Sequence, residues 1–348
     1  MIRNSLVASA SALALAACTT TTDTAETSTT DTAETSTMTP MSDTAESFNM
    51  TEPHDVLLAE WDGPHGGMPP FNLAERTDLF EPAIDEGINR LRADIAAIAA
   101  DTAPATFDNV FVPMEEAGAE LGRATTLFYT LTANRNTPEI QEIAKRVNPK
   151  LTAVFNEINF NDDLFARIKS IHDGREAAGL TAEQKRLVEK TYDRFVRSGA
   201  MLGDVAQSRV GDINTELSTL FTNFSQRVLA DESKLIPVSA AAVESLPEAL
   251  QSTYAGAAED ADMDGYAVAN TRSAVQPFLT FSDDRDARET VWRAFVNRGD
   301  NADENDTNDL IAEIVKLRAE RAKLLGFDSH AHYRMADTMA QDPERAMD

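Results

Sequence analysis

Apolar residues recur every three or four positions along the chain from about Thr77 onward, which is the spacing of one face of an α-helix. Pro82 lies in the first turn of the first predicted helix, where its missing N–H group costs little. Such stripes are typical of core packing, so the pattern predicts a helical body. The apolar positions of the first two stretches are Phe80, Ile84, Ile88, Leu91, Ile95 and Ile98, followed by Met114, Ala117, Leu121, Leu127, Phe128 and Leu131.

Capping residues and prolines predict where the next helices begin and end. Thr137, followed by a proline, is a predicted N-cap, and Pro149 predicts a kink or break near Asn148. Residues 181–184, Thr-Ala-Glu-Gln, form a capping box that opens a helix ending at Gly199. Further helices are predicted over a long segment with Ile213, Leu217, Leu220, Phe221, Phe224 and Val228 on its apolar face, over residues 283–298, and over residues 306–325.

The pattern changes near residues 233–282. Three short segments, LIPVS at 235–239, GYAVANT at 265–271 and QPFLTFS at 276–282, alternate in part and are bounded by Pro, Gly and Ser. These features favour a small sheet or an extended excursion. The predicted fold class is therefore mainly α, with a small β excursion near residues 233–282.

The N-terminus is typical of an exported bacterial lipoprotein. Residues 1–17 combine a positive Arg3, a short apolar stretch and small residues before Cys18, which is the layout of a cleavable secretory signal. Residues 15–18, Leu-Ala-Ala-Cys, resemble a lipobox, in which the cysteine receives the lipid. Cys18 is the single cysteine, so no disulfide forms within the chain, and its predicted role is lipidation. Thr19 favours the outer membrane over the inner one.

Residues 18–50 are predicted to be a disordered tether, and residues 51–348 the helical body. The tether is rich in Thr, Ser, Asp and Glu, it repeats the octet TDTAETST, and it has little to bury. The formal net charge of −27 argues against nucleic acid as a partner, because phosphate binding needs clustered Lys and Arg. The expected localisation is the cell envelope, with a lipid anchor at Cys18 and the body facing the periplasm.

The body resembles the zinc oligopeptidases of the thimet oligopeptidase and bacterial peptidyl-dipeptidase (Dcp) family, most of all the Dcp branch. The resemblance covers nearly everything from Trp61 to the end. It rests on five segments in order: WDGPHGGMPPF at 61–71, FEPAID at 80–85, LTAEQKRLVEKTYDRFVRSGA at 180–200, FLTFSDDRDARETVWRAFVNRGDN at 278–301 and AERAKLLGFDSHAHYRMADTMAQDPERAMD at 319–348.

The resemblance implies a mostly helical, two-lobed, clam-like zinc peptidase that accepts short peptides, and the Dcp branch releases C-terminal dipeptides. The family's zinc site is HExxH on one helix with a later Glu as third ligand, and this sequence contains no HExxH. The chain therefore resembles the first half of a family member, and it ends six residues after Asp342, a predicted helix start. No catalytic residue or zinc ligand is assigned, the partner implied is the missing C-terminal lobe, and the chain alone is expected to be inactive.

Other candidate chemistry in the sequence is weak. His330 and His332 are two apart on a predicted helix and would face different directions, so packing is favoured over a shared metal. His65 lies in the glycine-rich GPHGG loop, which lacks a P-loop lysine, and a structural role is favoured over a substrate contact. The acidic residues at 283, 284 and 286 are typical of a helix cap and first turn.

Two hypotheses follow from the sequence. In the first, the chain is the N-terminal portion of a lipid-anchored zinc oligopeptidase that hydrolyses short peptides in the cell envelope. In the second, it is a non-catalytic helical lipoprotein that acts as a peptide-binding or scaffolding module. Peptide preference, exo- or endopeptidase mode and oligomeric state stay open.

Overall fold

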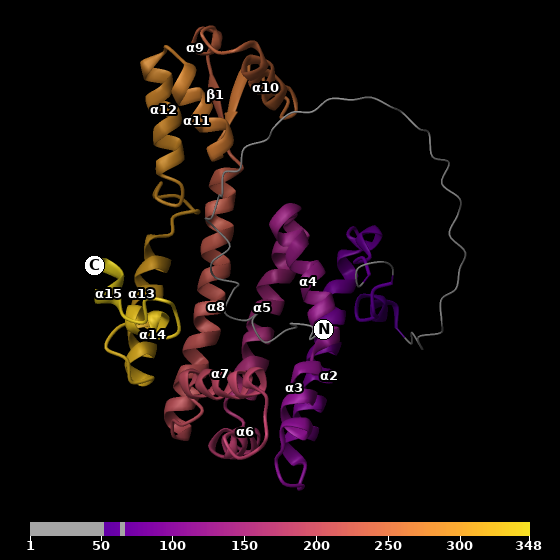
Figure 1. Cartoon of the computed structure of the whole chain (residues 1–348). Coiled ribbons are helices and arrows are strands. Elements are labelled where there is room, and N and C mark those ends of the chain that lie inside the picture. The colour runs from indigo at the N-terminus through magenta and orange to yellow at the C-terminus, as the bar shows by residue number, and fades with distance from the viewer. Residues whose placement is uncertain (1–51, 63–66) are drawn as a thin grey trace, which may run out of the picture. The chain divides into compact units, whose positions relative to one another are not determined.

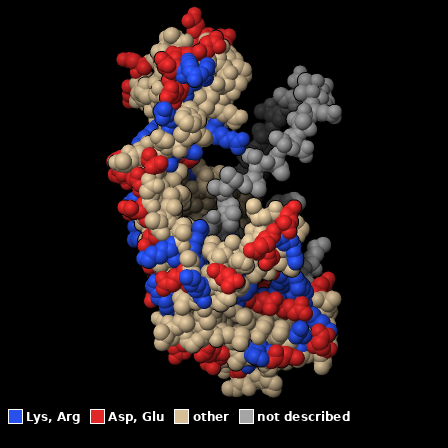
Figure 2. All heavy atoms as spheres, turned by 90° about the vertical axis from the view of Figure 1, so that its left-hand side faces the viewer, with Lys and Arg blue, Asp and Glu red and all other residues tan. Residues whose placement is uncertain are grey.

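The computed structural model describes residues 52–62 and 67–348, and these fall into two compact units that divide between Ala200 and Met201 (Figure 1). The predicted signal peptide, Cys18, the tether and His65 lie outside the described residues. None of the described helices combines the length and apolar composition that a membrane-spanning segment requires. Acidic and basic side chains are interspersed over much of the face drawn in Figure 2.

The regular elements of the first unit are all helices in its described part. Its α-helix α2 (Phe80–Ala100) packs against α4 (Ala119–Asn134), α5 (Pro138–Asn159) and α6 (Asp162–Gly174), and α6 packs against α7 (Ala182–Ser198). The short elements are the 3-10 helices η1 (Pro53–Leu57), η3 (Phe71–Leu73) and η4 (Thr77–Leu79), the π-helix η5 (Phe107–Phe111) and α3 (Val112–Glu116).

The predicted apolar stripe of α2 forms the centre of this unit's core. Phe80 is fully buried and its ring lies 5.7 Å from that of Phe128 in α4. Gly87 lies at a close approach of the two helices, since a Cβ atom there would come within 2.9 Å of the Leu121 Cα atom. The prediction of a helix with buried Ile84, Ile88, Leu91, Ile95 and Ile98 is confirmed.

The predicted caps are confirmed, and the structure departs from the sequence pattern at Pro149 and at Gly118. The Thr137 hydroxyl accepts from the Ile140 N–H, and the capping box at 181–184 is formed. Pro149 does not break its helix, because α5 runs through it with buried residues on both sides holding the helix in place. The stretch from Met114 to Leu131 is divided at Gly118, whose φ of +75° lies in the left-handed region and ends the α-helical path.

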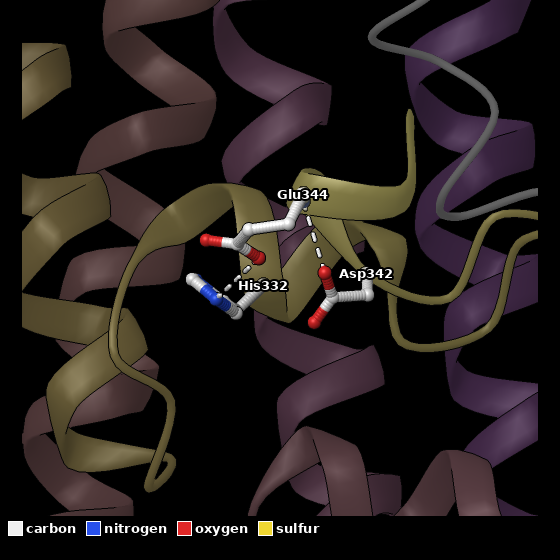
Figure 3. A group of neighbouring side chains, drawn as sticks. All are labelled: His332, Asp342 and Glu344. Carbon is white, nitrogen blue, oxygen red and sulfur yellow. Dashed lines mark hydrogen bonds and ion pairs between the residues drawn. The ribbon is translucent and has the colours of Figure 1, made fainter. Parts of the chain in front are cut away.

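The second unit combines helices with one small sheet. Strands β1 (Leu235–Val238) and β2 (Tyr266–Ala269) pair antiparallel, with Leu235 opposite Ala269 and Val238 opposite Tyr266. The α-helices are α8 (Asp204–Glu232), α9 (Ala240–Val243), α10 (Glu248–Glu259), α11 (Arg272–Phe281), α12 (Arg285–Val296), α13 (Asn308–Leu324), α14 (His330–Met335) and α15 (Pro343–Met347), of which α14 and α15 lie together (Figure 3).

The prediction of extended structure at 276–282 is wrong, since these residues lie almost entirely in α11. The two other segments do form the sheet. The helical period of α11 places Val275 and Phe278 in the core. Because α11 begins before the segment QPFLTFS, those seven residues alone are too few to show the helical spacing. The α11 residues join β1, β2, α10 and α12 around one apolar cluster.

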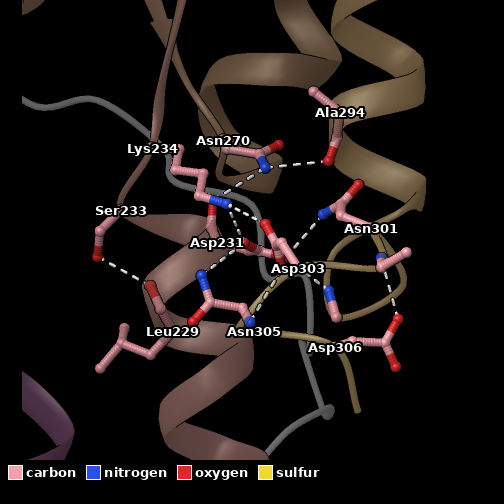
Figure 4. Close-up of polar contacts among 12 residues, drawn as sticks. Leu229, Asp231, Ser233, Lys234, Asn270, Ala294, Asn301, Asp303, Asn305 and Asp306 are labelled. Carbon is pink, nitrogen blue, oxygen red and sulfur yellow. Dashed lines mark hydrogen bonds and ion pairs between the residues drawn. The ribbon is translucent and has the colours of Figure 1, made fainter. Parts of the chain in front are cut away.

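A buried carboxylate holds the end of α8 to the loop before α13 (Figure 4). Asp231 is 1% exposed, and its two oxygens accept from the Gly299 N–H at 2.7 Å, the Asn301 amide at 2.9 Å and the Asn305 amide at 3.1 Å. The Lys234 Nζ atom lies 2.6 Å away. Burial would raise the pKa of Asp231, but these hydrogen bonds and the ammonium group together hold it below its ordinary value.

Replacing Gly87 with alanine should destabilise the first unit, although alanine favours helix by about 0.8 kcal/mol over glycine. The new methyl group would force α2 and α4 apart, at about 1–3 kcal/mol, so we expect a net loss of about 1–2 kcal/mol. The matched control is Gly256→Ala in α10. A Cβ atom added there would meet no neighbouring atom within 4 Å outside its own helix backbone, so stability should rise. Urea unfolding followed by Trp61 and Trp292 fluorescence measures both, and a stabilised Gly87→Ala protein would refute the close contact.

Replacing Asp231 with asparagine should lower the free energy of unfolding of the second unit by about 3 kcal/mol near neutral pH, since donors that now reach a buried carboxylate would lose it. The folded-state pKa of Asp231 is lowered, so its stabilising contribution is present above the unfolded pKa of about 3.9 and is lost as pH falls through the folded value. The difference between the two proteins should therefore shrink below about pH 4. Glu304→Gln, an exposed change in the same loop, serves as control, and equal stability of Asp231→Asn and wild type would contradict the expectation.

Candidate functional site

The described histidines do not gather into one site. His54 lies in η1, and the His172 ring in α6 stacks on Tyr192 in α7 at 3.9 Å between centroids. His330 and His332 both lie in α14, as predicted, and they have different neighbours. Asp284 caps α12 by accepting from the backbone N–H groups of the second and third helical residues, which confirms the predicted helix cap.

His332, Asp342 and Glu344 form a group that offers one nitrogen and two carboxylates (Figure 3). The His332 Nε2 atom lies 3.6 Å from the Glu344 Oε2 atom, and its Nδ1 atom lies 2.8 Å from the Ser329 hydroxyl oxygen. One Asp342 oxygen accepts from the N–H groups of Glu344 and Arg345, so it caps α15.

This group does not fit the zinc that the family resemblance implies. Its three ligand atoms lie within 4.8 Å of one another, but the group lacks the two histidines on one helix face that an HExxH zinc site supplies. Glu344 is largely exposed, and Asp342 is engaged as a helix cap. We therefore derive no chemistry through it, and the expectation that this chain holds no catalytic zinc ligand stays a prediction.

A second group of side chains brings positive charge together on α13 and α14. The Arg318 guanidinium lies over the Phe221 ring of α8 at 4.8 Å, and the Arg321 guanidinium lies over the Tyr333 ring at 5.5 Å. One Arg321 nitrogen donates to the Asn214 Oδ1 atom at 2.7 Å. We call Arg318, Arg321, His330 and Arg334 the arginine group.

Burial and mutual repulsion disfavour charge in this arginine group. Burial lowers the pKa of Arg318 and Arg321, and Arg334 lowers both further. The pKa of His330 falls to about 4, first through burial and then through repulsion by the three arginines. His330 is therefore neutral at pH 7, while the arginines keep their charge.

The motifs and spacings of the sequence did not predict the arginine group, although a signal is present. Arg318 and Arg321 have no acidic residue three or four positions away on their helix, whereas Lys316 has Glu313 and Glu320 at these spacings. Arg318 and Arg321 come close to Arg334 through the turn between α13 and α14, and the geometry of that turn cannot be predicted from sequence spacing.

Comparisons with known proteins match the chain to one family in two places. The model described as Neurolysin/Thimet oligopeptidase, N-terminal domain, matches residues 84–207, and that of Peptidase family M3 matches residues 278–348. Dipeptidyl carboxypeptidase of Escherichia coli (strain K12) is 35% identical over 271 residues, which are 77% of this chain and 40% of that protein. Oligopeptidase A of Salmonella typhimurium is 30% identical over 288 residues, 81% of this chain and 42% of its own length.

More distant relatives match in the same way. Saccharolysin of Saccharomyces cerevisiae is 21% identical over 314 residues, 89% of this chain and 42% of that protein. The chain thus spans about two fifths of the length of the curated relatives it matches. Two family models in the same order and these relatives confirm the resemblance seen in the sequence, and the chain belongs to peptidase family M3, a family of zinc-dependent peptidases.

Proposed function

We propose that this chain is the N-terminal portion of a zinc-dependent oligopeptidase of the peptidyl-dipeptidase type, which hydrolyses short peptides in the cell envelope. The observation that carries the proposal is the ordered match of both family models, supported by 35% identity to a dipeptidyl carboxypeptidase over 271 residues. The helical first unit fits this role, because its described residues form a packed apolar core that can serve as a framework.

In this proposal the 348 residues supply framework and peptide-facing surface, and the hydrolytic water is activated elsewhere. A catalytic zinc site needs three protein ligands and a water molecule, and HExxH places two histidines and a general base on one helix face. The 348 residues contain no HExxH. The ligands and the general base would therefore come from polypeptide that corresponds to the other three fifths of the relatives.

A non-catalytic helical module is the weaker alternative. It would explain a folded chain without HExxH, but it gives no reason for a match to peptidases over 77–81% of the chain. No observation on the described residues favours it specifically.

The activity test compares the 348-residue chain with a longer translation product of the same coding region that includes HExxH. We expect the longer protein to release dipeptides from N-terminally blocked peptides and to lose this activity in a chelator. The 348-residue chain should release none under the same conditions. Escherichia coli dipeptidyl carboxypeptidase is the positive control, and an inactive longer protein would argue for the non-catalytic module.

The envelope location rests on Cys18, which we propose carries the lipid anchor. Two or three acyl chains hold a protein on a membrane almost permanently, because each buried methylene contributes about 0.8 kcal/mol. Expressed in a bacterium, the wild-type chain should incorporate labelled palmitate and partition into detergent. Cys18→Ser should do neither, while Thr19→Ser should behave as wild type. Detergent partitioning of Cys18→Ser equal to that of wild type would contradict the proposed anchor.

A further inference from the structure

The arginine group has no acidic partner among the described residues, in a chain whose formal net charge is −27. The two acids on α13 nearest in sequence to these arginines pair elsewhere, since Glu313 pairs with Lys316 at 2.9 Å and Glu320 pairs with Arg209 at 2.6 Å. A half-buried guanidinium normally has an anion beside it, because a buried charge is costly unless it is paired. The missing partner is therefore the feature that needs an explanation.

Several donors in this group also lack hydrogen-bond acceptors. The Nε atoms of Arg318 and Arg321 are buried and have no acceptor in the described part of the chain. The His330 Nδ1 atom is also buried there without a hydrogen-bond partner. Arg321 uses one terminal N–H on Asn214 and has four further N–H groups. Buried donors without partners are rare, so these nitrogens mark a place where an acceptor belongs.

An aromatic ring lies beside each of two guanidinium groups in the arginine group. Arg318 lies against Phe221, and Arg321 lies against Tyr333. Stacking on a ring occupies the face of a guanidinium and leaves its edge for hydrogen bonds, and that edge matches the two oxygens of a carboxylate. Arg334 lies on α14, where it adds positive charge to the group.

We propose that the arginine group is a binding site for a carboxylate group, held by the guanidinium edges of Arg318 and Arg321 with Arg334 adding long-range attraction. A carboxylate supplies the acceptors and the negative charge that these side chains lack. The carboxylate has two sources, the C-terminus of a peptide or the side chain of an Asp or Glu residue in another segment of polypeptide. The choice of a carboxylate over an inorganic anion rests on the proposed function, because peptides carry carboxylates.

The test is an NMR titration of the full chain with three blocked tripeptides, which follows the Nε–H resonances of the arginines. Ac-Ala-Ala-Ala-OH carries a terminal carboxylate, Ac-Ala-Glu-Ala-NH2 carries one on a side chain, and Ac-Ala-Ala-Ala-NH2 carries none. We expect one of the first two peptides to bind with a dissociation constant at least about tenfold lower than that of the amide, as followed by the Arg318 and Arg321 signals. The peptide that binds identifies the source of the carboxylate. Equal binding of all three, or tighter binding of inorganic phosphate, would overturn the proposal.

Variants show where the carboxylate binds. Arg318→Gln and Arg321→Gln should each weaken binding about tenfold, and Arg334→Gln about threefold, because a charge that acts at longer range contributes less. Arg293→Gln in α12 removes an exposed arginine that pairs with Glu289, and it should leave binding unchanged. If the buried variants do not fold, Arg334→Gln and the wild-type titration still show whether a carboxylate binds at the arginine group. The titration contains a chelator and needs no turnover, so the absence of binding would not contradict the proposed peptidase function. Likewise, an inactive longer protein would not contradict the carboxylate site.

Discussion

The burial of one carboxylate, Asp231, determines how the second unit is closed. Four donors, one from Lys234 just before β1 and three from the 299–305 loop, converge on its oxygens, and together they outweigh the cost of removing a charge from water. Because the loop is held in this way, α13 begins at a defined place beside α8, and residues such as Ile213 and Leu317 can form their shared cluster. The positions of Arg318 and Arg321 over their rings depend on that same placement.

A buried charge needs hydrogen-bonding or charged partners, and this requirement is met near the start of α13 but not near its end. Asp231 has partners for both oxygens, whereas Arg318 and Arg321 have stacking partners but no described anion. A folded chain tolerates the second case when the charge stays partly hydrated or when a ligand completes the site. The contrast points to a ligand at the arginines and to a purely structural role for Asp231.

Much of the fold follows from sequence, and the exceptions have physical causes. The α2 stripe, the cap at Thr137 and the capping box at 181–184 are local signals, and all three are formed. Pro149 was misleading because packing on both sides outweighs one lost hydrogen bond. The α6 helix went unpredicted, and α11 was hidden by a segment too short to show its period. The arginine group depends on contacts between α8, α13 and α14, which no local pattern specifies.

The chain belongs to peptidase family M3, whose members are zinc-dependent peptidases, and its 348 residues contain no HExxH. Under the proposed function, the zinc ligands come from polypeptide other than these 348 residues, which stays a prediction. Metal analysis by mass spectrometry of the purified chain, after dialysis against buffer with trace zinc, tests this most directly. We expect far less than one zinc ion per chain. One tightly held zinc per chain, lost on replacing His332 with alanine, would contradict this placement.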